Sequence, residues 1–169
     1  MDAIQTILTR RSIRKFKETK IPDKAINKII ECALSAPSAR NQQPCHLIIV
    51  NERKLLNAIM EAHPNAKMLD KAPLAIIICG DTNIEPNMDY IALDCAAMTQ
   101  NILLATHALG LAGVWIGVYN RKEREAEIRK IFNLPHNIIP ISITAIGYAD
   151  EIPAPIERIT EGRIHYNKF

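Results

Sequence analysis

Two polar stretches of the sequence contain residue types that could bind a phosphorylated ligand. The first is basic and places Arg10, Arg11, Ser12 and Arg14 within five positions. Arginine can donate two parallel charge-assisted hydrogen bonds to a phosphate, and serine adds a short hydroxyl donor. A solvated basic turn is an equally good interpretation of this stretch when it is taken alone.

The second stretch is the decapeptide from Ser35 to Pro44, which contains two Ser, one Asn, two Gln and two Pro residues. It lies between an amphipathic helix and an apolar strand, and a polar loop in that position can readily donate hydrogen bonds to a ligand. The alternative is a surface turn that ends the preceding helix. The basic stretch nearer the N-terminus makes the ligand-binding interpretation more attractive.

Other kinds of chemistry find little support. The sequence has no glycine-rich dinucleotide fingerprint, no P-loop and no nucleophile elbow. The histidines and cysteines lack metal-ligand spacing, so we expect no bound metal. Asp81 and Asp94 are isolated carboxylates, and we assign no side chain to acid–base catalysis. The sequence thus offers hydrogen-bond donors for a phosphate but no recognisable set of catalytic side chains, which suggests that a cofactor carries out the chemistry.

Composition indicates an ordinary globular protein. The 169 residues favour a single domain spanning residues 1–169, and a net charge of +3 is too weak to argue for nucleic-acid or membrane binding. The four cysteines are scattered through apolar runs, which favours buried, reduced thiols in a cytoplasmic protein. The N-terminus has no charged-then-apolar signal segment, and polar residues interrupt the longest apolar stretch, 91–118.

Hydrophobic periodicity and capping residues predict helices and strands in alternation after two opening helices. The expected helices are 2–9, 22–34, 52–62, 88–109 and 121–132, and the expected strands are 46–50, 74–79, 112–119 and 138–148. This order fits a three-layer α+β or α/β domain. We expect Pro140 to mark an edge or a bulge, and Glu125 and Arg129 to pair across one helical turn.

The predicted helix 88–109 is apolar around almost its whole circumference. A helix of this kind is normally buried on every side. Because a domain of this size is unlikely to cover all of it, we expect a second subunit to cover part. The tail from Asp150 to Phe169 has apolar anchors but no core of its own, and we expect it to wrap around that partner.

These motifs, in this order, resemble the nitroreductase family of FMN-dependent flavoproteins. The basic stretch is similar to the family's R-R-S-x-R phosphate motif, and the polar decapeptide is similar to its A-P-S-x-x-N-x-Q-P-W loop. Three further stretches resemble the family's central helix, its G-L-G-x-x-W-I-G strand and its closing tail: residues 94–105, residues 109–117, and Arg158 with residues 163–167. The resemblance covers nearly the whole chain.

The resemblance implies an α+β fold: a three-layer α/β/α sandwich with a mixed, largely antiparallel central sheet and a C-terminal tail on the partner subunit. It also implies a homodimer with FMN at the subunit interface and NADH or NADPH as electron donor. The acceptor would be a nitroaromatic, a quinone or a related small molecule, reduced by a ping-pong mechanism. A non-catalytic FMN-binding module and a flavin-dependent reductive dehalogenase are the alternatives.

The resemblance also implies roles for single residues. Arg10, Arg11, Ser12 and Arg14 would hold the phosphate and ribityl chain, with Arg158 and Arg163 reaching the phosphate from the tail. The flavin contacts from the other subunit would be Pro37, Ser38, Ala39 and Asn41. The backbone of Trp115, Ile116 and Gly117 would pass beside the ring, and Asn65 aligns with a ring-contacting Asn. The family's Trp after Gln-Pro is Cys45 here, which removes aromatic packing under the loop.

Overall fold

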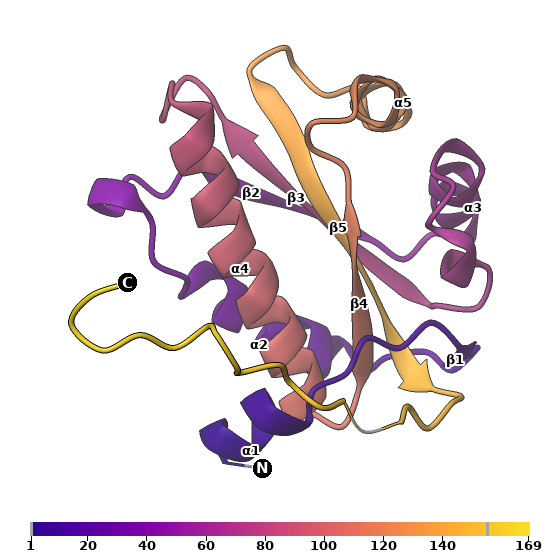
Figure 1. Ribbon diagram of the computed structural model, residues 1–169. Coiled ribbons are helices and arrows are strands. Elements are labelled where there is room, and N and C mark those ends of the chain that lie inside the picture. Colours follow the sequence, from indigo (N-terminus) through magenta and orange to yellow (C-terminus); the bar gives the residue numbers. More distant parts are fainter. Residues whose placement is uncertain (1, 155) are drawn as a thin grey trace.

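The computed structural model describes residues 2–154 and 156–169, and Figure 1 shows a central sheet with helices on both faces. The helices α2 (Asp23–Leu34) and α4 (Met88–Ala108) lie on one face, with α1 (Ala3–Thr9) beside the end of α4. The helices α3 (Arg53–Ala62) and α5 (Lys122–Phe132) lie on the other. The predicted three-layer α/β/α arrangement is therefore confirmed.

The sheet is organised around its longest strand, β5 (Ile138–Ala149). On one side β5 pairs with β3 (Leu74–Asp81), which in turn pairs with the edge strand β2 (Cys45–Val50). Along its other edge β5 pairs with β4 (Ala112–Gly117), and its last two residues pair with β1 (Phe16–Lys17), a two-residue strand that the sequence did not predict. All these pairs are antiparallel, and a parallel bridge joins Ser12 to Gly113.

The two faces of the sheet make two separate cores. Leu74, Ile76 and Ile78 of β3 pack toward α2 and α4, whereas the intervening Ala75 and Ile77 pack toward α3 and α5. This alternation follows from the two-residue period of a strand. Because both sets are fully buried, β3 appears in the sequence as a continuous aliphatic run.

Most predicted boundaries agree with the structure to within two residues. The side chain of Asp2 caps α1 by accepting a hydrogen bond of 2.9 Å from the N–H of Gln5. The register between β3 and β5 shifts opposite Pro140, so of the two predicted alternatives, an edge or a bulge, the bulge is confirmed. The predicted Glu125–Arg129 pair is wrong, because Glu125 accepts from the N–H of Asn120 and Arg129 donates to the Pro135 and His136 carbonyls.

The helix α4 is not covered on every side within one chain. Ile91, Cys95 and Ile102 are fully buried, but Leu93 is 66% exposed and Ala97 is half-buried. Further exposed apolar side chains come from the neighbouring helices α1 and α2: Ile4, Ile7, Leu8 and Leu34. A shallow pocket of about 390 Å³ lies between these helices and is lined by residues of α1, α2 and α4. The three helices therefore share one apolar surface.

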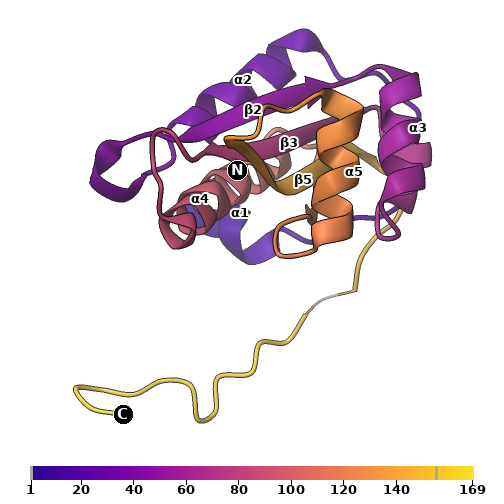
Figure 2. The same ribbon diagram turned by 90° about the horizontal axis from the view of Figure 1, so that it is seen from above.

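The C-terminal tail leaves the body of the molecule after β5 and extends away from it (Figure 2), with no helix or strand in its described residues. Its apolar side chains contact little of their own chain: Ile152, Ile159, Ile164, Tyr166 and Phe169 are all at least 61% exposed. Exposed apolar anchors on an extended segment fit a strap that packs on another surface. Among the described helices, none has the length and apolar character to cross a membrane.

Candidate functional site

The basic stretch lies where the end of α1 meets α4 and β4. The hydroxyl of Thr9 lies 2.8 Å from Nε2 of His107 near the end of α4. The N–H of Ile13 donates to the carbonyl of Gly113 in β4 at 3.2 Å. Ile13 is buried, so the residues on either side of it point outward. These contacts hold the backbone of the basic stretch against two regular elements.

Arg10 carries an unsatisfied donor at this position. Its Nη1 is buried and has no hydrogen-bond partner. Burial lowers the pKa of Arg10, and the positive charges of Arg158 and Arg11 lower it further. A buried cationic donor without a partner is costly, and an anion placed beside it would relieve both the missing hydrogen bond and the charge repulsion. The residues present therefore fit a phosphate group.

A pocket of about 320 Å³ opens beside Arg10 and Arg11 and is otherwise lined mainly by α4, the start of β4 and the first residues of the tail. Arg11 braces the turn, since its Nη1 donates to the carbonyls of Leu8 and Arg10. The carboxylate of Glu151, another lining residue, accepts from the N–H groups of Arg14 and Lys15 at 2.6 and 3.1 Å. That contact ties the start of the tail to the basic stretch.

The structure places several further predicted site residues around a second pocket of about 370 Å³. Its lining includes Arg14, Asn65, Trp115, Ile116 and Gly117, with Met68 and Lys67 from η2 (Lys67–Asp70). Trp115 is 38% exposed and Gly117 has no atom within 4 Å of where a Cβ would lie. A flat ligand could therefore approach the backbone of β4 closely here.

His63 is a residue of this pocket region that the sequence analysis missed. It is buried, and its Nε2 lies 2.9 Å from the carbonyl oxygen of Gly117, while its Nδ1 accepts from the N–H of Asn65 at 3.2 Å. These contacts require a neutral ring with its proton on Nε2. His63 thereby links the turn at Asn65 to β4. The position of His63 two residues before Asn65 is the feature of the sequence from which this role could have been inferred.

The polar decapeptide forms a loop around η1 (Ala39–Asn41), next to the first half of α4. Arg40, Asn41 and Gln43 all have positive φ angles between 54° and 55°. This conformation is uncommon for residues other than glycine, and such strain persists only where surrounding contacts determine it. Pro37, Ser38, Cys45 and Asp94 line a pocket of about 210 Å³ beneath the loop.

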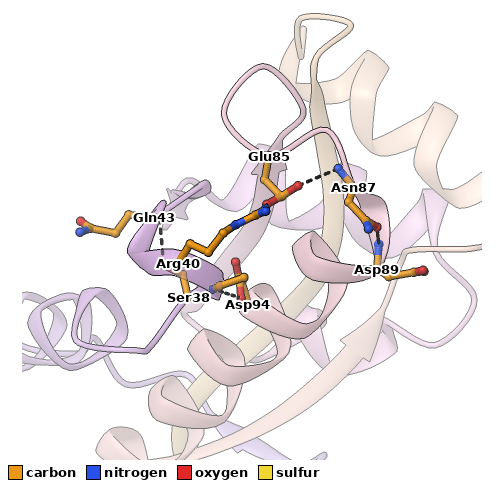
Figure 3. Close-up of polar contacts among 8 residues, drawn as sticks. Ser38, Arg40, Gln43, Glu85, Asn87, Asp89 and Asp94 are labelled. Atoms are coloured by element: carbon orange, nitrogen blue, oxygen red, sulfur yellow. Dashed lines mark hydrogen bonds and ion pairs between the residues drawn. The ribbon is translucent and has the colours of Figure 1, made fainter.

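Two carboxylates hold this loop in place (Figure 3). The Oδ1 atom of Asp94, on α4, accepts from the N–H of Ala39 at 2.9 Å. The buried Glu85 pairs with the guanidinium of Arg40 and also accepts from the N–H of Asn87. The sequence suggested that Asp94 is an isolated carboxylate, and this contact shows that the suggestion was wrong. An acidic residue within an apolar run of this helix was the signal for its buried role.

Within one chain the two groups of predicted site residues lie near opposite ends of α4. Asp94 contacts the decapeptide loop, and His107 contacts the basic stretch. At 1.5 Å per residue these two positions are about 20 Å apart along the helix axis. One chain therefore does not bring Ser38 and Asn41 to Arg10 and Ser12.

The tail arginines differ in their positions. Arg158 lies near enough to Arg10 for its charge to lower the pKa of that residue. Arg163 lies farther along the exposed tail, where its N–H donates to the carbonyl of Thr160. Of the two tail arginines, Arg158 is thus the one whose charge acts on the basic stretch. Among the described residues, no cluster of three or more His, Cys, Asp or Glu side chains could hold a metal ion.

Replacement of His63 by Gln should reduce the loss of stability at acidic pH. Burial lowers the pKa of His63 from its ordinary value of 6.5, so the unfolded chain takes up the proton at higher pH than the folded chain does. The free energy of unfolding therefore falls as the pH drops below about 6.5. Urea unfolding at neutral and mildly acidic pH should show a smaller drop for His63→Gln than for the wild type. Replacement of the exposed His136 by Gln is the control, and an unchanged drop in His63→Gln would contradict the assignment.

Comparison with known proteins agrees with this architecture. The model of the nitroreductase family matches residues 7–67 and 61–148. A protein of Methanothermobacter thermautotrophicus, provisionally named an NADH dehydrogenase/NAD(P)H nitroreductase, is 41% identical over 169 residues, which is 100% of this chain and 88% of the relative. The NADPH-flavin oxidoreductase of Vibrio harveyi is 28% identical across 99% of this chain and 75% of its own length.

A solved structure gives the same result. The FMN-dependent nitroreductase of Clostridium difficile superposes with a TM-score of 0.91 at 30% identity and covers 98% of this chain and 99% of its own. The match of the family model, the high identity over the full chain and the shared fold agree with one another. The chain belongs to the nitroreductase family.

Proposed function

We propose that this protein is an FMN-dependent oxidoreductase that takes electrons from NADH or NADPH and passes them to a nitroaromatic, a quinone or a related small acceptor. The observation that carries the proposal is the buried Nη1 of Arg10, which lacks a partner and lies near Arg11 and Arg158. Such a donor is suited to a phosphate.

The four cysteines are free thiols, which fits a reducing compartment. We therefore propose that the protein is located in the cytoplasm.

The chain's own residues would bind and orient the cofactor. Arg10, Arg158 and the hydroxyl of Ser12 would hold the phosphate, since charge-assisted hydrogen bonds are the strongest available to it. The exposed backbone of Trp115 and Gly117, with Asn65 held by His63, would lie beside the ring. The FMN of related proteins supplies two-electron chemistry when it is bound, and no side chain is required here as proton donor.

Substrate access would follow from the open pocket at β4. The pocket lined by Trp115 and Asn65 is continuous with solvent, so a nicotinamide and an acceptor could occupy the same space in turn. Alternate occupation of a single pocket gives ping-pong kinetics. The family resemblance alone supports this mechanism over the non-catalytic FMN-binding module and the reductive dehalogenase, and the geometry is compatible with all three.

We further propose a homodimer in which two chains complete each site. The two groups of site residues lie about 20 Å apart along α4 in one chain, at 1.5 Å per residue, so a second chain is needed to bring them together. The apolar surface of α1, α2 and α4 and the exposed anchors of the tail offer the contact area. The loop that carries Ser38 and Asn41 would then cover the cofactor bound to the partner.

Rapid mixing of the purified, FMN-loaded protein with NADH or NADPH tests the activity. We expect the flavin absorbance to bleach rapidly under anaerobic conditions and to recover when an acceptor is added. Bound FMN that neither nucleotide bleaches would support the non-catalytic module instead. Failure of the protein to bind FMN at all would overturn the proposal.

Replacement of Arg10 by Ala should weaken FMN binding much more than replacement of Lys15 by Ala. A charge-assisted bond contributes about 1.5–3 kcal/mol, which corresponds to roughly ten-fold to over one-hundred-fold in affinity. The exposed charge of Lys15 should contribute little. Fluorescence titration of FMN with each apoprotein measures both affinities. Equal losses would mean that the basic stretch acts only as a diffuse positive field.

Replacement of Ala97 by Glu should break the dimer and release FMN. Ala97 lies on α4 and is half-buried within one chain, so an interface there would bury the new carboxylate at a cost of several kcal/mol. The matched control is Ala126→Glu, at an exposed position of α5 on the opposite face of the sheet. Sedimentation read at flavin and protein wavelengths should show a flavin-free monomer for Ala97→Glu only. A wild-type monomer that retains FMN stoichiometrically would exclude the shared site.

A further inference from the structure

Two cysteines from distant parts of the sequence meet beneath the decapeptide loop. Cys45 is the first residue of β2, directly after the loop, and Cys95 lies on α4. Their sulfur atoms are 3.3 Å apart, within hydrogen-bond contact of each other. Cys45 is also the residue that replaces the family's Trp. The contact is therefore a feature of this chain that the family pattern does not contain.

The pair is open to small reagents on one side only. Cys45 is half-buried and lines the pocket of about 210 Å³ beneath the loop, whereas Cys95 is fully buried. Pro37, Ser38 and Asp94 line the same pocket. A molecule the size of hydrogen peroxide could therefore reach the sulfur of Cys45, and the sulfur of Cys95 would be the nearest thiol behind it.

The surroundings give the two sulfurs different roles. The hydrogen bond from Cys95 lowers the pKa of Cys45, although burial and the charge of Asp94 oppose this effect. The same hydrogen bond, together with burial, raises the pKa of Cys95. Because the thiolate is the nucleophile, Cys45 is the attacking sulfur and Cys95 the resolving one. Burial raises the pKa of the remaining buried thiol, Cys79, to about 12, and it should be inert.

We propose that Cys45 and Cys95 form a redox-active dithiol that a peroxide oxidises reversibly to a disulfide. Cytoplasmic disulfides are usually transient and serve redox sensing or catalysis, and a reversible bond here would be of that kind. The dithiol reaction itself needs no FMN, although its pocket shares Pro37 and Ser38 with the proposed FMN site. It is a modification site that joins the loop to α4.

The reaction proceeds in two balanced steps. The thiolate of Cys45 attacks one peroxide oxygen and the O–O bond breaks, which leaves Cys45 as a sulfenic acid; the departing oxygen takes up the proton that the thiol lost and leaves as water. The sulfur of Cys95 then attacks the sulfur of Cys45, the S–O bond breaks, and the released hydroxide leaves as a second water with the proton of Cys95. Two thiols lose two electrons in total, and one peroxide gains them.

The bond would act on the loop itself. Cys95 follows Asp94, whose carboxylate already holds the N–H of Ala39 at 2.9 Å. A disulfide would add a covalent link beside that hydrogen bond, between the end of the loop and the same turn of α4. Reduction would leave the loop held by polar contacts only, among them those of Asp94, Glu85 and Ser38.

Peptide mapping of the oxidised wild-type protein tests the proposal directly. Reduced full-length protein is treated with hydrogen peroxide, the remaining thiols are blocked with N-ethylmaleimide, and the non-reduced digest is analysed by mass spectrometry. We expect one linked peptide pair containing Cys45 and Cys95, and a fall from the four free thiols of the chain to two. Dithiothreitol should restore all four.

Single variants separate the two roles, with Cys32→Ser as the matched control because Cys32 is also half-buried. Cys32→Ser should form the linked peptide as the wild type does. Cys95→Ser should form none and should leave a sulfenic acid at Cys45 that dimedone labels. Three results with the wild-type protein would overturn the proposal: oxidation of Cys32 or Cys79 first, a disulfide between the Cys45 residues of two chains, or no disulfide at all. Because these results come from the wild type, the test does not depend on the folding of any variant.

Discussion

The burial of α4 against the sheet is the constraint on which the rest of the structure depends. Ile91, Cys95 and Ile102 fix one side of this helix in the core, and the two polar stretches are attached near its two ends through Asp94 and His107. Because a helix has a fixed rise per residue, the two stretches are held apart within one chain. The other side of α4 remains apolar and partly exposed. The separation of the polar stretches and the surface available for a partner thus have the same origin.

The decapeptide loop shows how polar contacts can replace aromatic packing. Three residues of this loop have a left-handed backbone, which costs free energy unless neighbouring contacts compensate. Those contacts come from the buried carboxylates of Asp94 and Glu85, and from the hydroxyl of Ser38, which accepts from the N–H of Gln43 at 2.9 Å. The loop therefore keeps a defined shape with Cys45 in place of the family's Trp. The smaller side chain leaves room for the contact with Cys95.

The fold could be predicted well from the sequence because local patterns carry it. The continuous aliphatic run of β3, the amphipathic pattern of α2 and the cap at Asp2 each depend on residues close together in the chain. The two-residue strand β1 could not be predicted, since its pairing with the end of β5 comes from residues more than 100 positions away. The Glu125–Arg129 pair failed for a similar reason: nearby backbone groups outside the helix compete for both side chains.

By itself, the sequence determined the α-helices and every strand except β1, the apolar character of one helix around most of its circumference, and the chemistry with which Arg10 and Ser12 could bind a phosphate. Only the tertiary structure decided that Arg10 has a buried donor without a partner, that His63 joins Asn65 to β4, and that Cys45 meets Cys95. Each of these depends on burial or on contacts between distant segments. Residue type and local spacing carry no information about either, because both arise when the helices pack on the sheet.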